Sequence, residues 1–280
     1  MKLAFIGGGN MAHALITGLK NQAGLKHQQF TMSDITVIEL DASKRTELSQ
    51  NLGVNTSNEL SSVQACDVIV LAIKPQQLPA LAKTLAPLLK QQLVISIAAG
   101  IRLKDLSRWL GNYATIIRAM PNTPAQIQAG VTGLYALPGV SKAQIALADQ
   151  VLSAAGSTIW LDSEEKLDAV TAISGSGPAY VFYLIEALQE AALQLGLSES
   201  QAKQLSIATF KGASLLADAS AIPIATLREQ VTSKGGTTEQ GLLSLQNSQV
   251  KQAVVLAAKK ACERAKTLGI ELGSDELGNN

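Results

Sequence analysis

The sequence predicts a doubly wound α/β domain at residues 1–162, followed by an all-α domain at residues 163–280. In the first part, short apolar and β-branched runs alternate with helix-like segments, whereas long alanine- and leucine-rich segments fill the second part. A chain of 280 residues is also longer than one compact domain usually is. These observations together favour two domains of different class.

Seven short runs in the first part are expected to be strands. They are apolar throughout rather than alternating, which is typical of strands buried on both faces of a parallel sheet with crossover helices. The runs are residues 3–6, 35–38, 68–73, 93–97, 116–117 with their flanks, 131–137 and 157–161.

Helices are expected at residues 179–195, 201–217 and 249–268. A single helix over residues 163–195 would be about 50 Å long at about 1.5 Å per residue, and a helix of that length usually needs a partner subunit. We expect Gly175, Gly177 and Pro178 to break it. Ser176 would then be the N-cap of the second piece, with Pro178 in its first turn.

The composition indicates a globular chain, since hydrophobic residues make up 47% and charged residues 16%. The net charge of +1 comes from scattered charges, which provides no electrostatic footprint for nucleic acid or an anionic membrane. Without such a footprint, a small molecule is the expected partner. Cys66 and Cys262 lie far apart without metal-ligand spacing, so we expect reduced thiols and no metal site. Glycines interrupt the long uncharged runs, which argues against a signal peptide or a membrane span, so the sequence predicts a cytoplasmic protein.

A G-x-G-x-x-A motif follows the first expected strand directly. Gly7 permits the tight turn, Gly9 lets a pyrophosphate approach the backbone, and Ala12 allows close contact between helix and strand. The N-terminus of the following helix would face the phosphates. The motif therefore predicts a dinucleotide site that contains Gly7, Gly8, Gly9, Asn10, Met11 and Ala12.

Loops after three later strands are expected to complete a cofactor crevice, because ligands of open α/β sheets bind beyond the carboxyl ends of the strands. Any one of these loops could be simple turn chemistry. Beside a nucleotide motif, three of them on one edge are better explained as a binding site. The expected cofactor contacts are Asn58, Ala72, Ile73, Lys74, Pro75, Ala98, Ala99, Gly100, Met120 and Asn122.

Glu39 stands at the end of the second expected strand. An acid there would bind the ribose 2′-hydroxyl and repel a 2′-phosphate, which favours NADH. Lys44 and Arg45 follow closely, and either meet a 2′-phosphate or are solvated charges. On residues alone, NADH has a slight edge over NADPH.

Taken with the helical part, these loops resemble the pyrroline-5-carboxylate reductase family, and the motifs keep the family's order over nearly the whole chain. The resemblance implies a Rossmann domain followed by an all-helical domain, similar in arrangement to that of 6-phosphogluconate dehydrogenase. It also implies a homodimer or higher homo-oligomer with interlocked helical domains. The matching motifs are residues 6–12, 72–75, 96–100, 118–125, 174–180 and 235–238, of which the last three together are specific.

The resemblance implies hydride transfer from NADPH or NADH to the C=N carbon of 1-pyrroline-5-carboxylate, which gives L-proline in the last step of proline biosynthesis. The family's glycine-rich loop binds the substrate, and the threonine matching Thr238 contacts the ring nitrogen. A helix that begins near Thr237 would present free N–H groups to a carboxylate. Without the resemblance, the stretch would be an N-cap and turn. The implied substrate residues are Ser233, Gly235, Gly236, Thr237 and Thr238.

The chain departs from the family pattern at three places. Lys234 stands where many members have proline, and residues 219–223 lack a glutamate that contacts substrate in some members. Glu39 stands where the family often has small polar or basic residues that suit NADPH. The family pattern and Glu39 therefore point to different cofactors.

Two other functions are compatible with a nucleotide-binding domain followed by helices. A β-hydroxyacid dehydrogenase shares the two-domain plan but needs a lysine on the helical side, and Lys166 lies about a turn or more from residues 174–178. A nucleotide-sensing protein would keep the cofactor fold without turnover. Such a protein has no need of residues 233–238.

Overall fold

The computed structural model describes residues 1–22 and 31–274. The chain divides into two compact units, Met1–Ser176 with Ala261–Asn280, and Gly177–Lys260. The predicted boundary after residue 162 follows the change from strands to helices, whereas the first unit also holds residues 163–176 and the end of the last helix. Within the described ranges, no helix has the length and apolar character needed to cross a membrane.

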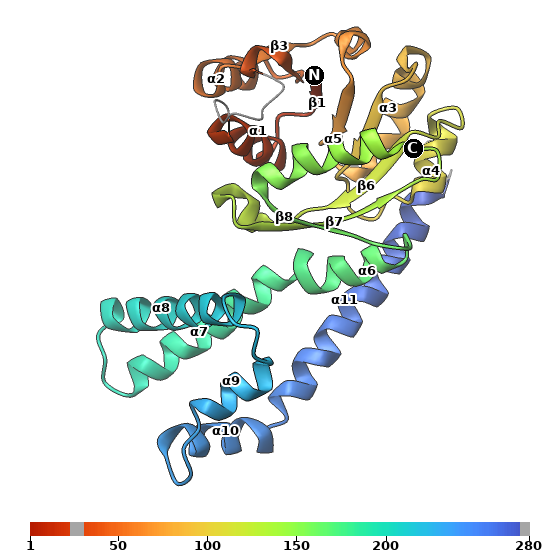
Figure 1. The fold of residues 1–280 in the computed structure, drawn as a ribbon. Coiled ribbons are helices and arrows are strands. Elements are labelled where there is room, and N and C mark those ends of the chain that lie inside the picture. Colours follow the sequence, from red (N-terminus) through yellow and green to blue (C-terminus); the bar gives the residue numbers. More distant parts are fainter. Residues whose placement is uncertain (23–30, 275–280) are drawn as a thin grey trace. The chain divides into compact units, whose positions relative to one another are not determined.

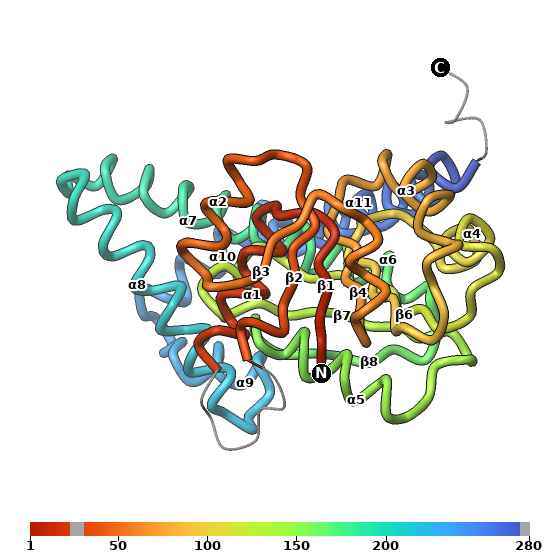
Figure 2. Tube along the Cα trace, turned by 90° about the horizontal axis from the view of Figure 1, so that it is seen from above, coloured from red at the N-terminus to blue at the C-terminus, as the bar shows by residue number. Residues whose placement is uncertain are grey.

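An eight-stranded sheet forms the centre of the first unit (Figures 1 and 2). The strand order is β3-β2-β1-β4-β5-β6-β7-β8, and its first six strands have the doubly wound order of dinucleotide-binding domains. The predicted fold class is confirmed. The strands are β1 (Leu3–Ile6), β2 (Ile35–Ile38), β3 (Asn55–Ser57), β4 (Val68–Leu71), β5 (Leu93–Ser96), β6 (Ile116–Met120), β7 (Gly130–Ala136) and β8 (Gly156–Trp160).

Two features of the sheet differ from the prediction. β3 was not among the expected strands, because Asn55, Thr56 and Ser57 are polar residues on the sheet edge. β7 runs antiparallel to β6, whereas a parallel sheet was expected. The connection between them holds only the short 3₁₀ turn Thr123–Ile127 in place of a crossover helix, and antiparallel neighbours need no crossover.

Helices cover both faces of the sheet. On one face lie α1 (Asn10–Gln22), α2 (Ala42–Leu52) and α5 (Lys142–Leu152), and on the other lie α3 (Leu78–Leu85) and α4 (Leu103–Trp109). The side chains of β1 alternate between the two cores: Leu3 and Phe5 join the first, and Ala4 and Ile6 join the second. β1 is therefore buried on both faces, as its uniformly apolar sequence predicts.

The first segment of this unit, Met1–Ser176, ends with α6 (Lys166–Val170) and a π-helix, Thr171–Gly175. The predicted break at Gly175 is this π-helix, and a Cβ at Gly175 would lie 2.7 Å from Cε of Met120. The prediction of Ser176 as an N-cap is wrong, because Ser176 has helical angles and its N–H donates to Thr171 O at 2.8 Å. A π-helical turn contains one residue more than an α-helical turn, and the chain continues through it from α6 into α7 without leaving the helical conformation. Pro178 does lie in the first turn of α7, as predicted.

The second unit is helical and exposes most of its apolar side chains. Only Ala202 and Ser206 are buried among residues 177–260, while Phe182 is 64% and Tyr183 72% exposed. α7 and α8 pack side by side (Figure 1). A single chain therefore gives this unit almost no core of its own. Its helices are α7 (Gly177–Gln194), α8 (Glu199–Asp218), α9 (Ile224–Gln230), α10 (Thr237–Asn247) and the first part of α11 (Val250–Gly273).

Candidate functional site

A pocket of about 540 Å³ lies beyond the carboxyl ends of β1, β2 and β4. The strand order reverses between β1 and β4, and this switch point is where open α/β sheets bind ligands. Eight of the predicted cofactor residues line the pocket. They are Gly7, Gly8, Gly9, Glu39, Asn58, Ala72, Ile73 and Lys74.

The glycines form a cradle between β1 and α1. Gly7 has φ of 99°, and a Cβ there would lie 2.7 Å from the carbonyl oxygen of Ala72, so a side chain has neither the space nor the backbone angle it needs. A Cβ at Gly9, in contrast, would have no neighbouring atom within 4 Å. The N–H of His13 donates to Gly9 O at 2.9 Å, which makes Gly9 the N-cap of α1 and leaves the N–H groups of the first helical turn without helical acceptors. The cradle can therefore hold an anionic group.

Glu39 lies against this cradle. Its Oε2 accepts the Gly8 N–H at 3.0 Å, and its Oε1 accepts the Asp41 N–H at 3.1 Å. Partial burial acts to raise the pKa of Glu39, but the N–H groups of Asp41 and Gly8 and the charge of Lys44 outweigh it, so the pKa is lowered. The pocket thus contains a carboxylate at the position where the sequence predicts a ribose contact.

The two basic residues after Glu39 have different surroundings. Arg45 donates through Nη1 to the carbonyl oxygens of Glu39 and Leu40, both at 2.8 Å, and it does not line the pocket. Lys44 does line the pocket. Of the two predicted candidates for a 2′-phosphate, only Lys44 lies beside the pocket.

The remaining predicted cofactor residues lie outside this pocket. Asn10, Met11 and Ala12 form the first turn of α1, and Pro75 begins a 3₁₀ turn before α3. Ala98, Ala99 and Gly100 follow β5, where a Cβ at Gly100 would lie 3.1 Å from Leu272 in α11. Met120 ends β6, and Asn122 uses its Oδ1 to accept the Val131 N–H at 2.9 Å.

Besides Lys44, six lining residues are not among the predicted cofactor contacts: Ile6, Ile38, Leu40, Leu60, Gln77 and Leu81. Gln77 and Leu81 follow the predicted Lys74–Pro75 loop and continue into α3. The Lys74–Pro75 loop could have indicated Gln77 and Leu81, because the first residues of a helix that begins at a crevice lie close to that crevice. Leu60 lies just after β3, which was itself missed.

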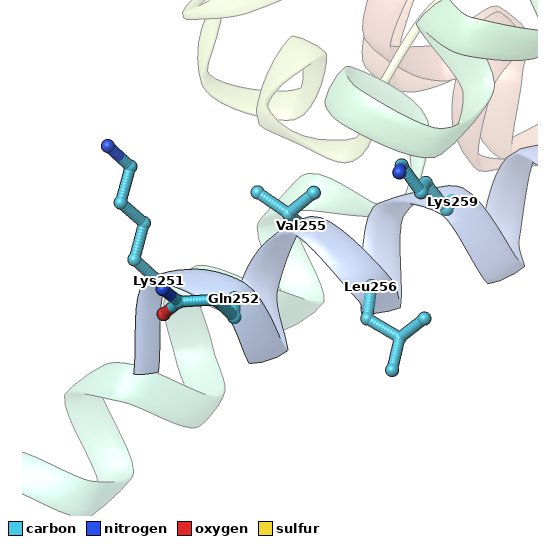
Figure 3. Close-up of a pocket in the computed structure, with 5 residues that line it drawn as sticks. All are labelled: Lys251, Gln252, Val255, Leu256 and Lys259. Carbon is cyan, nitrogen blue, oxygen red and sulfur yellow. The ribbon is translucent and has the colours of Figure 1, made fainter. Parts of the chain in front are cut away.

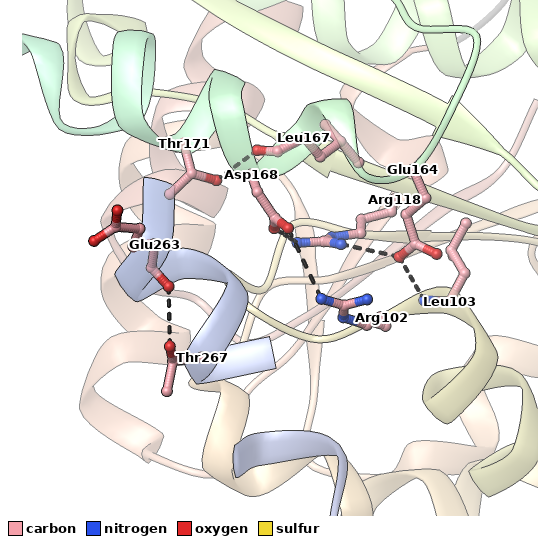
Figure 4. A network of polar contacts seen from close by, with 9 residues as sticks. All are labelled: Arg102, Leu103, Arg118, Glu164, Leu167, Asp168, Thr171, Glu263 and Thr267. Carbon is pink, nitrogen blue, oxygen red and sulfur yellow. Dashed lines mark hydrogen bonds and ion pairs between the residues drawn. The ribbon is translucent and has the colours of Figure 1, made fainter. Parts of the chain in front are cut away.

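A buried cluster of charged side chains ties β6 to α4 and α6 (Figure 4). Arg118 is 4% exposed and lies between two acids: its Nη1 is 2.9 Å from Glu164 Oε1, and its Nη2 is 3.8 Å from Asp168 Oδ1. Glu164 Oε1 also accepts the N–H of Leu103 at 2.8 Å, at the start of α4. Arg102 lies 3.9 Å from Asp168 on the other side. The cluster fixes α6 against the strand that ends at Met120.

The predicted substrate residues belong to the second unit. Ser233 O accepts the Gly236 N–H at 3.0 Å, and a Cβ at Gly236 would overlap Ser233 Oγ. Gly235 is left-handed with φ of 73°, and α10 begins at Thr237 as predicted. Gly236 is the N-cap and has no side chain, so the first N–H groups of α10 have neither helical nor side-chain acceptors from the cap. The loop therefore offers N–H donors and the Thr238 hydroxyl together.

Lys166 is paired, since its Nζ donates to Asp162 Oδ2 at 2.8 Å on the exposed surface of the first unit. Lys166 is the one lysine that the sequence offered for dehydrogenase chemistry on a hydroxy acid, and its partner here is a surface acid. The hydroxyacid dehydrogenase alternative thus gains no support from the site.

Family models match the chain in two parts. Residues 164–268 match the model described as pyrroline-5-carboxylate reductase dimerisation. Residues 2–100 match the model described as NADP oxidoreductase, coenzyme F420-dependent. The two matched segments fall on either side of the predicted domain boundary.

Two relatives that match over nearly the whole length are pyrroline-5-carboxylate reductases. The chain is 43% identical to pyrroline-5-carboxylate reductase of Pseudomonas aeruginosa, over 96% of this chain and 98% of that protein. It is 34% identical to pyrroline-5-carboxylate reductase 2 of Bacillus subtilis, with 94% of both chains covered.

Solved structures agree. The pyrroline-5-carboxylate reductase of Coxiella burnetii superposes with a TM-score of 0.89 at 39% identity, covering 95% of this chain and 98% of that one. The pyrroline carboxylate reductase of Plasmodium falciparum, solved with NADP bound, gives a TM-score of 0.84 at 30% identity, covering 96% and 98%. The similarity thus extends over both units.

Proposed function

The chain belongs to the pyrroline-5-carboxylate reductase family, and we propose that it reduces 1-pyrroline-5-carboxylate to L-proline in the last step of proline biosynthesis. The observation that carries this proposal is the whole-length similarity to reductases of that name, at up to 43% identity. The glycine cradle at the switch point supports it independently, because such a cradle suits the pyrophosphate of a dinucleotide.

The residues of the pocket fit a nicotinamide dinucleotide. Gly7 allows the tight turn after β1, Gly9 leaves room for a pyrophosphate, and the N-terminus of α1 provides N–H donors for it. Glu39 and Lys44 would meet the adenosine ribose. The reduced cofactor, when bound, supplies the hydride that the C=N carbon of the substrate accepts.

The loop Ser233–Thr238 is the proposed substrate site. The free N–H groups of Thr237 and Thr238 would bind the carboxylate, and Gly235 and Gly236 let it come close. The Thr238 hydroxyl would hydrogen-bond the ring nitrogen, donating to the neutral imine and accepting from the N–H of the iminium. A cyclic imine accepts hydride best as its iminium, whose nitrogen already carries the proton of the product amine, so correct placement of this hydroxyl matters more than a strong acid.

A homo-oligomer follows from the match to the family's dimerisation model and from the exposed apolar side chains of the second unit. In α11, for example, Val255 and Leu256 are 48% and 57% exposed between Lys251 and Lys259 (Figure 3). Burial of such side chains against the same surface of a second subunit would provide the core that one chain lacks.

We also propose a cytoplasmic location, which suits the free thiols Cys66 and Cys262.

The purified protein is expected to oxidise NADH or NADPH when 1-pyrroline-5-carboxylate is added, because its whole-length relatives are reductases of that name and its glycine cradle suits a dinucleotide. Loss of the nicotinamide absorbance follows the rate, and chromatography of the product identifies L-proline. Cofactor without substrate provides the blank. If neither cofactor is consumed, the enzyme assignment is wrong.

Replacement of Glu39 by serine is expected to shift the cofactor preference toward NADPH. The change removes a carboxylate that would repel a 2′-phosphate, and we expect the ratio of kcat/KM for NADPH over NADH to rise about tenfold, equivalent to about 1.4 kcal/mol. Asp41→Asn is the matched control, since Asp41 is also acidic and caps α2 without lining the pocket. An unchanged ratio in Glu39→Ser would show that this carboxylate does not select the cofactor.

A further inference from the structure

Glu239, which the sequence analysis did not consider, folds back onto the proposed substrate loop. It is the third residue of α10, and its Oε2 accepts the N–H of Gly235 at 2.8 Å. Gly235 is the residue of the loop with a left-handed backbone conformation, and a Cβ at this position would have no neighbouring atom within 4 Å. The N-cap of the helix, Gly236, has no side chain that could make a similar bond. A side-chain bond from Glu239 therefore restrains the one loop residue that has a left-handed backbone conformation.

This bond bears on how the loop presents its donors. A glycine populates left-handed and right-handed backbone angles with similar ease, so Gly235 alone does not hold one conformation. A hydrogen bond to a carboxylate is shorter and stronger than one between neutral groups. By fixing the Gly235 peptide, Glu239 fixes the chain that leads through Gly236 into Thr237 and Thr238.

The same carboxylate also adds negative charge at the end of α10 where the anionic substrate would bind. Negative groups at a helix N-terminus share the field of its free N–H groups, and two of them in one place repel each other. Lys234, the exposed residue before Gly235 in the sequence, carries a charge of opposite sign. The loop thus holds an internal acid whose bond restrains Gly235 and whose charge would oppose that of an anionic ligand.

We propose that Glu239 is a positioning residue of the substrate loop, one that orients Thr237 and Thr238 for turnover at a cost in affinity for the anionic substrate. This inference rests on the proposed function. It predicts opposite effects for two substitutions, because glutamine keeps the acceptor oxygen and loses the charge, whereas alanine loses both. A helix cap without a role in turnover would not produce this divergence.

The test compares steady-state kinetics of the full-length wild type, Glu239→Gln and Glu239→Ala with 1-pyrroline-5-carboxylate as the varied substrate. In Glu239→Gln we expect KM to fall about threefold with kcat within about twofold of wild type, the size of a single-charge effect at a helix N-terminus. In Glu239→Ala we expect kcat to fall about tenfold and KM to rise, since the loop loses a charge-assisted bond. Cofactor affinity, measured by fluorescence, is expected to stay the same in both.

Glu199→Gln is the matched control, because Glu199 is the acid in the first turn of α8, outside the substrate loop. It is expected to leave KM and kcat unchanged. An active wild type whose Gln and Ala variants change in the same way, or not at all, would overturn this inference and leave the proposed function standing. A wild type without turnover would overturn the proposed function, and the inference with it.

Discussion

Thr238→Ala is expected to lower kcat for 1-pyrroline-5-carboxylate about 100-fold, the lower end of what a positioned proton donor contributes. Thr238 is the second residue of α10, and its hydroxyl has no hydrogen-bond partner among the described residues. That hydroxyl is therefore available for the ring nitrogen, next to the N–H groups proposed to hold the carboxylate. Stopped-flow or steady-state measurement of nicotinamide absorbance gives the rate.

Two controls separate this role from a structural one. Thr238→Ser keeps the hydroxyl and is expected to stay within a few-fold of the wild-type kcat, which alanine cannot do. Cofactor binding and thermal stability are expected to persist in Thr238→Ala, because the side chain is exposed and lies in the second unit, away from the glycine cradle in sequence. An alanine variant with the wild-type rate would remove Thr238 from the mechanism.

The parts of the fold that the sequence predicts well are those determined by local patterns. β1 and β2 begin and end at the predicted residues, because each is uniformly apolar and followed by turn residues or polar residues. β3 was missed because Asn55-Thr56-Ser57 carries no apolar pattern, and it is a strand only because β2 pairs with it. The π-helix at Thr171–Gly175 was also not predicted. Gly175, Gly177 and Pro178 indicate a break in the helix, but they do not indicate which type of break forms.

The candidate site shows the same division. The glycine motif identifies the cradle because its spacing alone specifies a strand, a tight turn and a helix. The bond from Gly8 to Glu39 joins residues 31 apart, and the one from Leu103 to Glu164 joins residues 61 apart, so neither is visible before the sheet is assembled. The Gly235–Glu239 bond is local, and an acid at the third helical position was a signal that could have been used.

Arg118→Met is expected to destabilise the protein by about 3–5 kcal/mol, because it removes the buried cation that lies between two acids and leaves their negative charges poorly compensated. Arg118 and Asp168 are 4% and 6% exposed, and Glu164 is 19% exposed. Arg102, at 3.9 Å from Asp168, would remain as the only cation close to that acid among the described residues. Denaturant unfolding of the full chain, followed by circular dichroism, measures the loss.

The cluster also provides its own controls, and these distinguish buried charge from lost packing. Lys166→Met breaks an ion pair in the same region whose side chains are 58% and 74% exposed, and it is expected to cost at most about 1 kcal/mol. Addition of Asp168→Asn to Arg118→Met is expected to restore part of the stability, because the amide needs no countercharge. If Arg118→Met costs no more than Lys166→Met, the cluster does not hold α6 against β6. If the double variant is no more stable than Arg118→Met alone, the loss comes from packing rather than from the uncompensated acid.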